Sequence, residues 1–236
     1  YHQHKLKQLF LSTDPLSVRP MFIGFSKDLK SFGFSSLLSG LAPFFENVER
    51  FGQKTILNWT PGKTPAKKQY WPSVVNADYN TNSKPAESDY AKAISIFENA
   101  VRHRLISDRP IGCLLSGGLD SSVVCAVAAK IMAEEYPGKK LKSFSIGMKE
   151  GTDIVYAKSV AEHLNKLYGN IEHEIIYFTP QEGLDAIDTV LQNTETYDIT
   201  TIRASVGQYL LGKYIYTNTD IKVVLTDDGA DEGEIA

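Results

Sequence analysis

The chain has 236 residues, of which 42% are hydrophobic and 22% charged, and a formal net charge of −3. This composition is typical of one large globular domain or two smaller ones. The small net charge gives no electrostatic argument for binding nucleic acid or a membrane surface, and no apolar run reaches the roughly 18 residues that a membrane-spanning helix needs.

The two cysteines, Cys113 and Cys125, lie in an apparent strand and an apparent helix. They are therefore interpreted as small buried apolar residues rather than as a disulfide or metal-binding pair. No secretory leader pattern opens the sequence. Together these features predict a cytoplasmic protein.

The first part of the chain has a β pattern. Residues 1–60 contain short apolar stretches, separated by turn signals such as Asp14-Pro15 and Thr60-Pro61-Gly62. This pattern predicts several antiparallel strands and one helix near 36–41. The apolar stretches are 9–11, 21–23, 32–34 and 55–57. Residues 61–86 are rich in Pro, Lys, Asn, Ser and Thr, which is typical of a linker.

From Glu87 the pattern of apolar residues changes to a helical period that runs to Leu105. Beyond Pro110 strands and helices alternate, which predicts an α/β fold with a doubly wound, mostly parallel sheet over residues 87–236. The expected strands are 111–115, 141–147, 172–177 and 222–226, and the expected later helices are 120–136, 153–167, 180–193 and 205–218. In such sheets ligands bind beyond the carboxyl ends of the strands.

The most informative motif follows the first of these strands. Residues 116–122 read Ser-Gly-Gly-Leu-Asp-Ser-Ser and lead directly into an apolar helix. Two adjacent glycines permit a sharp turn, and the N–H groups at the start of a helix bind anions such as phosphate. Ser116, Ser121 and Ser122 add hydroxyl donors. Asp120 would repel a phosphate unless a divalent cation lies between them, so the motif predicts a magnesium–pyrophosphate site.

Other interpretations of the motif are weaker. It lacks the Lys-Ser/Thr that follows the glycines of a Walker loop, and it lacks the third glycine of a dinucleotide fingerprint. The structural alternative is an ordinary helix start with Asp120 or Ser121 as the N-cap.

Two further strand ends would lie at the same edge. After the second strand, Ile146 and its neighbours offer backbone groups and an apolar side chain that suit an adenine ring. After the last strand, Asp227, Asp228, Asp231 and Glu232 place four carboxylates within six residues. A solvated acidic turn is the simplest interpretation of that cluster. Because its strand runs parallel to the loop strand, Asp231 and Asp120 could instead hold magnesium between them.

The segment 195–205 is dense in hydroxyl groups and lies between expected helices. Arg203 could bind a carboxylate or phosphate through both guanidinium nitrogens. The alternative is structural, with Thr200 or Thr201 capping a helix and Arg203 in a surface pair.

These strings resemble a known family. Ile111-Gly-Cys-Leu-Leu-Ser-Gly-Gly-Leu-Asp-Ser-Ser122 looks like the pyrophosphate loop of the PP-loop ATP pyrophosphatases, which have a HUP-like fold. With Ser143–Gly147, Glu195–Gly207 and Gly229–Glu232, the chain resembles glutamine-dependent asparagine synthetases over most of residues 87–232. Residues 14–24 resemble the final part of the N-terminal-nucleophile glutaminase domain of that family, an α+β domain, so residues 1–60 are expected to be its remnant.

The resemblance implies a chemistry. ATP and aspartate would react to β-aspartyl-AMP and pyrophosphate, and ammonia, supplied directly or from glutamine, would release asparagine and AMP. By matched position, Arg203, Thr200 and Asp228 are the implied catalytic residues, and Asp120 and Asp231 would bind Mg²⁺. The implied nucleotide-binding residues are Leu115, Ser116, Gly117, Gly118, Asp120, Ser121, Ser122, Ile146, Thr226, Asp227 and Gly229.

The chain also departs from the family pattern. The glutaminase nucleophile is an N-terminal Cys, whereas this chain starts with Tyr1, so we expect it not to hydrolyse glutamine. Thr226, Asp227 and Asp228 stand where the family has Ser-Gly-Glu. After Glu232 the family continues with a Gly-rich stretch, so we expect the chain to be truncated at its C-terminus.

Two alternatives stay open from sequence. One is a non-catalytic nucleotide-binding relative, favoured by Asp227. The other is a different PP-loop synthetase that forms amides or lactams. A homodimer is one assembly that the sequence leaves open.

Overall fold

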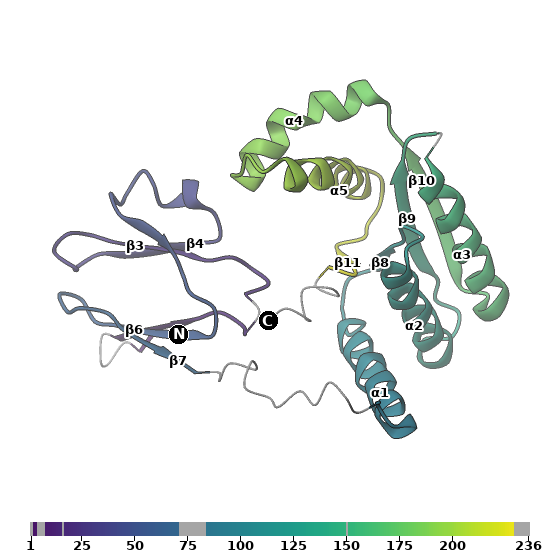
Figure 1. Cartoon of the computed structure of the whole chain (residues 1–236), viewed down its shortest axis with the longest axis horizontal. Coiled ribbons are helices and arrows are strands. Elements are labelled where there is room, and N and C mark those ends of the chain that lie inside the picture. Colours follow the sequence, from purple (N-terminus) through teal and green to yellow (C-terminus); the bar gives the residue numbers. More distant parts are fainter. Residues whose placement is uncertain (1, 4–7, 16, 71–83, 150, 229–236) are drawn as a thin grey trace. The chain divides into compact units, whose positions relative to one another are not determined.

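The computed structural model describes the chain apart from residues 1, 4–7, 16, 71–83, 150 and 229–236 (Figure 1). The chain divides into two compact units, Tyr1–Tyr79 and Asn80–Ile235. Each unit is described by itself below.

The first unit is built from two antiparallel sheets. One has the order β1-β2-β6-β7 and the other the order β4-β3-β5. Their inner side chains, among them Leu11, Ile23 and Leu57, form a small hydrophobic core. The strands are β1 His2–Gln3, β2 Gln8–Ser12, β3 Phe22–Phe25, β4 Phe32–Ser35, β5 Val48–Arg50, β6 Thr55–Trp59 and β7 Ala66–Gln69. The four apolar stretches noted in the sequence fall in β2, β3, β4 and β6, so the prediction of antiparallel strands is confirmed there.

Two expectations for this region were wrong. The segment expected to be a linker from residue 61 contains β7, which pairs with β6 from Thr55 opposite Gln69 to Asn58 opposite Ala66. All four residues of β7 are exposed. A strand without an apolar face has no alternation for sequence analysis to detect. The helix expected at 36–41 is only a short 3-10 helix, Leu38–Gly40.

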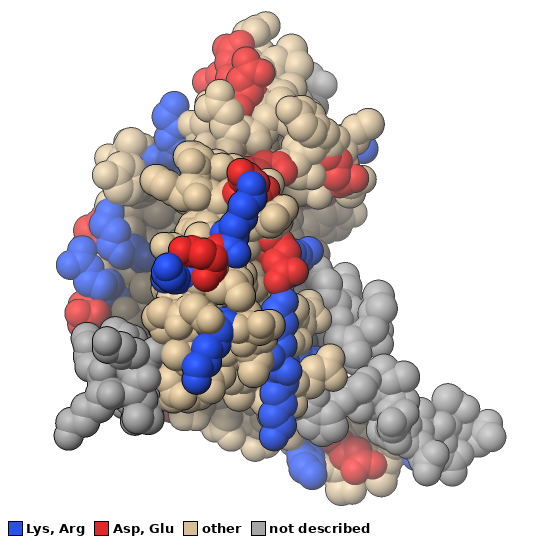
Figure 2. Space-filling view, turned by 90° about the vertical axis from the view of Figure 1, so that its left-hand side faces the viewer, with Lys and Arg blue, Asp and Glu red and all other residues tan. Residues whose placement is uncertain are grey.

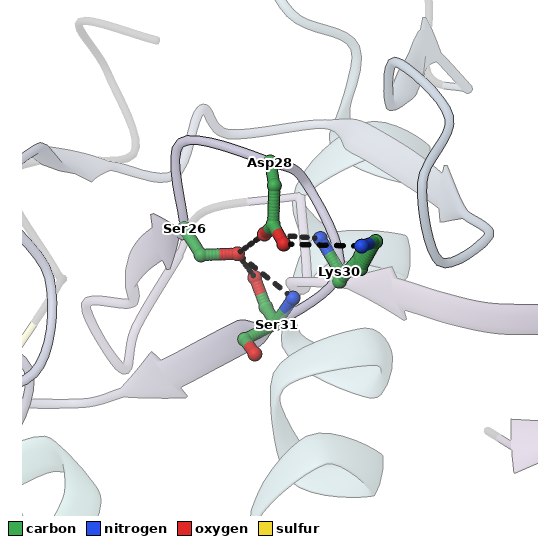
Figure 3. Close-up of polar contacts among 4 residues, drawn as sticks. All are labelled: Ser26, Asp28, Lys30 and Ser31. Atoms are coloured by element: carbon green, nitrogen blue, oxygen red, sulfur yellow. Dashed lines mark hydrogen bonds and ion pairs between the residues drawn. The ribbon is translucent and has the colours of Figure 1, made fainter.

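The turn between β3 and β4 is closed by side chains (Figure 3). The Ser26 hydroxyl donates to the Asp28 carboxylate at 2.7 Å and accepts from the Ser31 N–H at 2.9 Å. The Lys30 N–H donates to the same carboxylate at 3.1 Å. These contacts, the Ser26 hydroxyl foremost, lower the pKa of Asp28. This exposed charged cluster therefore has a structural role in the hairpin.

The second unit contains a parallel sheet with the strand order β10-β9-β8-β11. The strands are β8 Ile111–Leu114, β9 Leu141–Gly147, β10 Ile171–Tyr177 and β11 Val223–Leu225. All three pairings are parallel, with Cys113 opposite both Ser143 and Leu225. The carboxyl ends of β8, β9 and β11 therefore meet at one edge.

Helices cover both faces of this sheet. The helices are α1 Glu87–Arg104, α2 Leu119–Glu135, α3 Thr152–Tyr168, α4 Pro180–Thr194 and α5 Ile199–Asn218. One core packs α2 and α3 against alternate residues of the strands, including Cys113, Leu115 and Leu141. A second core packs α5 against the opposite face through Phe144. The predicted doubly wound, mostly parallel α/β sheet is confirmed.

One boundary in this unit was predicted wrongly. Helix α5 begins at Ile199, not near 205, because Asp198 caps it by accepting from the Thr201 N–H at 2.7 Å. Thr200 and Arg203 consequently lie in the first turns of a helix rather than in a loop.

The surface gives no single-sign field on the face drawn in Figure 2, where Lys and Arg side chains are interspersed with Asp and Glu. Among the described residues, no helix combines the length and the apolar character that crossing a bilayer requires.

Candidate functional site: the carboxyl edge of the parallel sheet

The glycine turn joins β8 to α2 at the carboxyl edge of the sheet. Gly118 is the N-cap of α2, with extended backbone angles (φ −70°, ψ 169°) and no side-chain cap. The interpretation that Asp120 or Ser121 caps this helix is therefore wrong. The first turn of α2 keeps its N–H groups without a capping side chain, and Asp120 lies in that turn. Such a helix start favours an anion.

The serines of this loop hold its shape. Ser121 is almost fully buried, at 1% exposure. Its hydroxyl oxygen accepts a hydrogen bond from the Ser116 N–H at 3.2 Å and lies 2.8 Å from the Ser116 hydroxyl oxygen. The Ser122 hydroxyl donates to the Gly118 carbonyl at 2.5 Å. These hydroxyl groups therefore organise the turn, and their use as phosphate donors stays a prediction.

Gly117 fits where no other residue would. Its φ of 89° lies in the left-handed region, and a Cβ built there would come within 2.5 Å of the Ala157 backbone nitrogen on α3. The turn thus packs directly against the second helix of the same face.

The segment after β11 lies beside this turn. Because β11 pairs in parallel with β8, the residues that follow Leu225 emerge next to the residues that follow Leu114. The pKa of the Cys113 thiol is raised well above its ordinary value. The largest cause is the hydrogen bond with the Cys125 thiol, followed by burial and then by the nearby charge of the Asp227 carboxylate. That influence of Asp227 is consistent with a position close to β8. Gly229 and Asp231 lie outside the described residues, so the predicted pairing of Asp231 with Asp120 stays a prediction.

Cys113 and Cys125 are both buried and free, so they form no disulfide. The expectation that they behave as small core residues is confirmed.

The two residues expected to contact a nucleotide through the sheet face opposite sides. Leu115 is 1% exposed in the core beneath α2 and α3, and its N–H donates to the Phe144 carbonyl at 2.9 Å. Ile146 packs on the α5 side and lines a pocket of about 470 Å³ with residues of β10, α4 and α5. The sheet brings their backbones to the same edge but keeps their side chains apart.

Helix α5 brings Thr200 and Arg203 toward the same edge. The position of a Cβ on Gly207 would be 3.9 Å from the Ile146 side chain, near the carboxyl end of β9. The far end of α5 leads to the amino end of β11. The first turns of α5 therefore extend past the carboxyl ends of the strands, and both Thr200 and Arg203 are exposed there.

A buried polar chain was missed in the sequence. Ser143 and Ser145 face the α2–α3 side of β9 and both contact His173 of β10, and the Ser145 hydroxyl donates to the Leu115 carbonyl. The available signal was two serines at alternate positions of an otherwise buried strand. A buried hydroxyl needs a hydrogen-bond partner, so this pattern indicates that a partner exists but does not show which residue it is.

The residues at this edge fit a magnesium nucleotide in their chemistry. Carboxylate oxygens are the ligands that Mg²⁺ prefers; Asp120 lies in the first turn of α2, and Asp227 and Asp228 follow β11, which pairs with β8. Within the described part of the chain, no group of three or more His, Cys, Asp or Glu residues is close enough to form a metal site by itself.

Comparison with known proteins identifies the family. The asparagine synthase family model matches residues 92–233, more than half of the chain. The chain belongs to that family.

Curated relatives carry the same name. The chain is 38% identical over 245 residues to the glutamine-hydrolysing asparagine synthetase of Homo sapiens and 39% identical over 248 residues to that of Gallus gallus. In both comparisons 96% of this chain matches 43% of the relative, so the chain spans less than half of those proteins. Among solved structures, NAD⁺ synthetase from Burkholderia pseudomallei covers 62% of the chain, and 64% of its own chain is matched, at 14% identity and a TM-score of 0.36.

Proposed function

We propose that this chain carries the ATP-binding part of an asparagine-forming ligase. One observation carries the proposal above the others. The Ser-Gly-Gly turn ends in an uncapped helix with Asp120 in its first turn, at the edge where the acidic segment after β11 emerges. This arrangement suits the pyrophosphate half of a magnesium nucleotide.

The proposed reaction has two steps. In the first, an oxygen of the aspartate side-chain carboxylate bonds to the α-phosphorus of ATP, and the bond from that phosphorus to the bridging oxygen breaks. Pyrophosphate leaves with the electron pair, and β-aspartyl-AMP is formed. In the second step, ammonia bonds to the acyl carbon, the bond to AMP breaks, and one proton is lost from nitrogen. The products are asparagine and AMP.

Each residue has a proposed role in these steps. The N–H groups of the glycine turn and of the start of α2 hold the departing pyrophosphate. Asp120 and Asp231 hold magnesium, which when bound neutralises part of the triphosphate charge. Arg203 and Thr200 orient the aspartate carboxylate, whose approach to a phosphate would otherwise be repelled. Asp228 stands near the activated carboxyl group, and Thr226, Asp227 and Gly229 line the nucleotide.

The test is pyrophosphate release from ATP with magnesium, ammonia and a panel of carboxylic acids. Release that depends on aspartate supports the proposal. Release with another acid alone supports a different amide-forming ligase. Binding of ATP without release supports a non-catalytic nucleotide-binding protein.

A matched pair of variants links the activity to the turn. Asp120→Asn should abolish release, because the amide cannot replace a carboxylate ligand of magnesium. Asp188→Asn, on the exposed surface of α4, should leave release unchanged. Equal activity of the two variants would contradict the proposed site.

A further inference from the structure

A continuous chain of hydrogen bonds crosses the sheet and ends at the glycine turn. The Ser143 hydroxyl lies 2.9 Å from His173 Nδ1, and the Ser145 hydroxyl lies 3.2 Å from His173 Nε2. The Ser145 hydroxyl also donates to the carbonyl of Leu115, the last residue before the turn. The chain therefore runs from β10 through β9 to β8.

Counting protons assigns the tautomer of His173. A serine hydroxyl has one hydrogen, and that of Ser145 is donated to the Leu115 carbonyl. Ser145 can therefore only accept from His173, which places the proton of the neutral ring on Nε2. Nδ1 is then an acceptor, and the Ser143 hydroxyl donates to it. In this arrangement both hydroxyls and both ring nitrogens have a partner, and the ring also interacts with the Ser143 backbone.

The two serines of the chain are shielded from solvent. Ser143 and Ser145 are 0% and 3% exposed, and His173 is half-buried. Residues 141, 143 and 145 of β9 alternate with Phe144, so they face α2 and α3 rather than α5. Ala157 and Ala161 are the buried residues of α3 beside this region. Most titratable residues of α3 are exposed to solvent, namely Asp153, Tyr156, Lys158, Glu162, His163 and Lys166, whereas Tyr168 at its end is half-buried against the core.

The last link controls the orientation of the turn. The Leu115 carbonyl and the Ser116 N–H belong to one rigid peptide plane. Ser145 bonds the oxygen of that plane, and the Ser121 hydroxyl accepts from its nitrogen at 3.2 Å. The plane is thus clamped from both sides, once by β9 and once by α2. A proton on His173 Nε2 occupies the other side of the Ser145 hydroxyl and leaves the Ser145 hydrogen on the Leu115 side.

We propose that His173 is a positioning residue for the phosphate-binding turn, acting through Ser145 on the Leu115–Ser116 peptide. The inference rests on the proposed function, since it names the group that holds the same site in place. Loss of the Nε2 donor frees the Ser145 hydroxyl to rotate, the peptide plane loses one of its two restraints, and the N–H groups that follow become misaligned for a phosphate.

Two amide substitutions separate the two ends of the imidazole. In His173→Gln the side-chain nitrogen is as many bonds from Cβ as Nε2, so it can still donate to Ser145. In His173→Asn the amide reaches only the position of Nδ1, so the contact with Ser143 is kept and that with Ser145 is lost. Ser145→Ala removes the hydroxyl that joins His173 to the Leu115 carbonyl. Because this substitution is smaller, it tests the same contact if His173→Asn folds poorly.

The experiment measures hydrogen–deuterium exchange of peptides that cover residues 115–122, with α1 peptides as the internal reference, and ATP–magnesium binding by calorimetry. We expect His173→Asn and Ser145→Ala to exchange faster in 115–122 and to bind ATP about fivefold to tenfold more weakly, the factor that one net hydrogen bond contributes. His173→Gln should keep both values near those of the unsubstituted chain.

Two outcomes would decide against the inference, and a third would decide against the proposed function alone. Unchanged exchange of 115–122 in both His173→Asn and Ser145→Ala would overturn positioning of the turn. Faster exchange in both with unaltered ATP affinity would overturn its role in binding. Failure of the unsubstituted chain to bind ATP would reject the proposed function, and the exchange comparison would still decide whether His173 orders the turn.

Discussion

At the residue scale, Gly117 combines two constraints that usually occur separately. Its backbone is left-handed, and its Cα faces the α3 backbone at a distance that excludes any Cβ. Gly138, in the turn after α2, has nearly the same conformation (φ 83°) but nothing within 4 Å of a built Cβ. A substitution at Gly138 therefore tests backbone strain alone, whereas one at Gly117 tests backbone strain together with a steric clash.

Gly138→Ala should cost about 1–2 kcal/mol of stability, the ordinary penalty for a left-handed residue, and should leave ATP binding unchanged. Gly117→Ala should cost more, because the new methyl must push the turn away from Ala157, and it should abolish ATP binding. Chemical denaturation and calorimetry measure the two effects. Equal losses of stability in both variants, with binding kept, would contradict the packing of the turn on α3.

His173 should make the stability of the second unit depend on pH. Burial, opposed by a hydrogen bond with the Ser143 backbone, lowers the pKa of His173 below its ordinary value near 6.5. The unfolded chain then binds more protons than the folded chain between the two pKa values, so stability rises with pH in that window. We expect a loss as pH falls below about 6.5 and no contribution well above it.

Thermal unfolding of the unsubstituted chain and of His173→Gln between pH 5 and 8 checks this. The variant should lack the part of the acid-side loss that His173 causes. Parallel profiles would show that folding does not shift the pKa of His173.

Several of these residues could be predicted from the sequence and others could not. The glycines and Asp120 form a contiguous motif, and their chemistry is legible without a structure. His173 lies 50 or more positions from the turn that it supports, and only the pairing of β10 with β9 and of β9 with β8 brings them together. Nothing local to His173 indicates its partners.

At the element scale, α5 depends on the residue that caps its start. Asp198 accepts hydrogen bonds from the Thr201 N–H and, at 2.8 Å, from the Thr201 hydroxyl. These bonds, the backbone bond first, lower the pKa of Asp198. The cap therefore stabilises the fold at neutral pH and is lost as pH falls through that lowered pKa. The first turns that it begins carry Thr200 and Arg203.

Asp198→Ala should fray the start of α5, lower the melting temperature of the second unit by about 2–4 °C, and weaken aspartate-dependent turnover more than ATP binding. Asp198→Asn keeps an acceptor at the N-cap and should resemble the unsubstituted chain in both measurements. If the alanine variant loses ATP affinity and aspartate dependence equally, α5 does not act on the aspartate side of the site.

The sequence located this helix only in part, for a physical reason. Residues 199–202 include two threonines and two isoleucines, whose β-branched side chains have a low helix propensity. Their pattern favours a loop, and the aspartate cap overrides it. By contrast, α2 and α3 begin after glycines, α2 is apolar over most of its length and α3 has an apolar face, so their limits were predicted closely.

At the scale of the whole molecule, each unit has its own hydrophobic core. Leu57 is fully buried in the core of the first unit, and Leu141 is fully buried in that of the second. Since each core consists of residues from a single unit, the two units should unfold in separate transitions.

Leu57→Ala and Leu141→Ala should each destabilise one transition by about 2–5 kcal/mol, the cost of a buried leucine cavity, and leave the other in place. Differential scanning calorimetry distinguishes them. ATP should shift only the transition that Leu141→Ala weakens. A single transition lowered by both variants would show that the units unfold together.

The opposed side chains of Leu115 and Ile146 have a consequence for selectivity. A purine ring that touches both positions must lie across the ends of β8 and β9, where it meets peptide groups instead of entering a groove on either face. Backbone N–H and C=O groups, rather than side chains, would then form the hydrogen bonds to the edge of the base. Conservative exchanges such as Ile146→Val would alter affinity slightly and leave the preference for adenine over guanine intact.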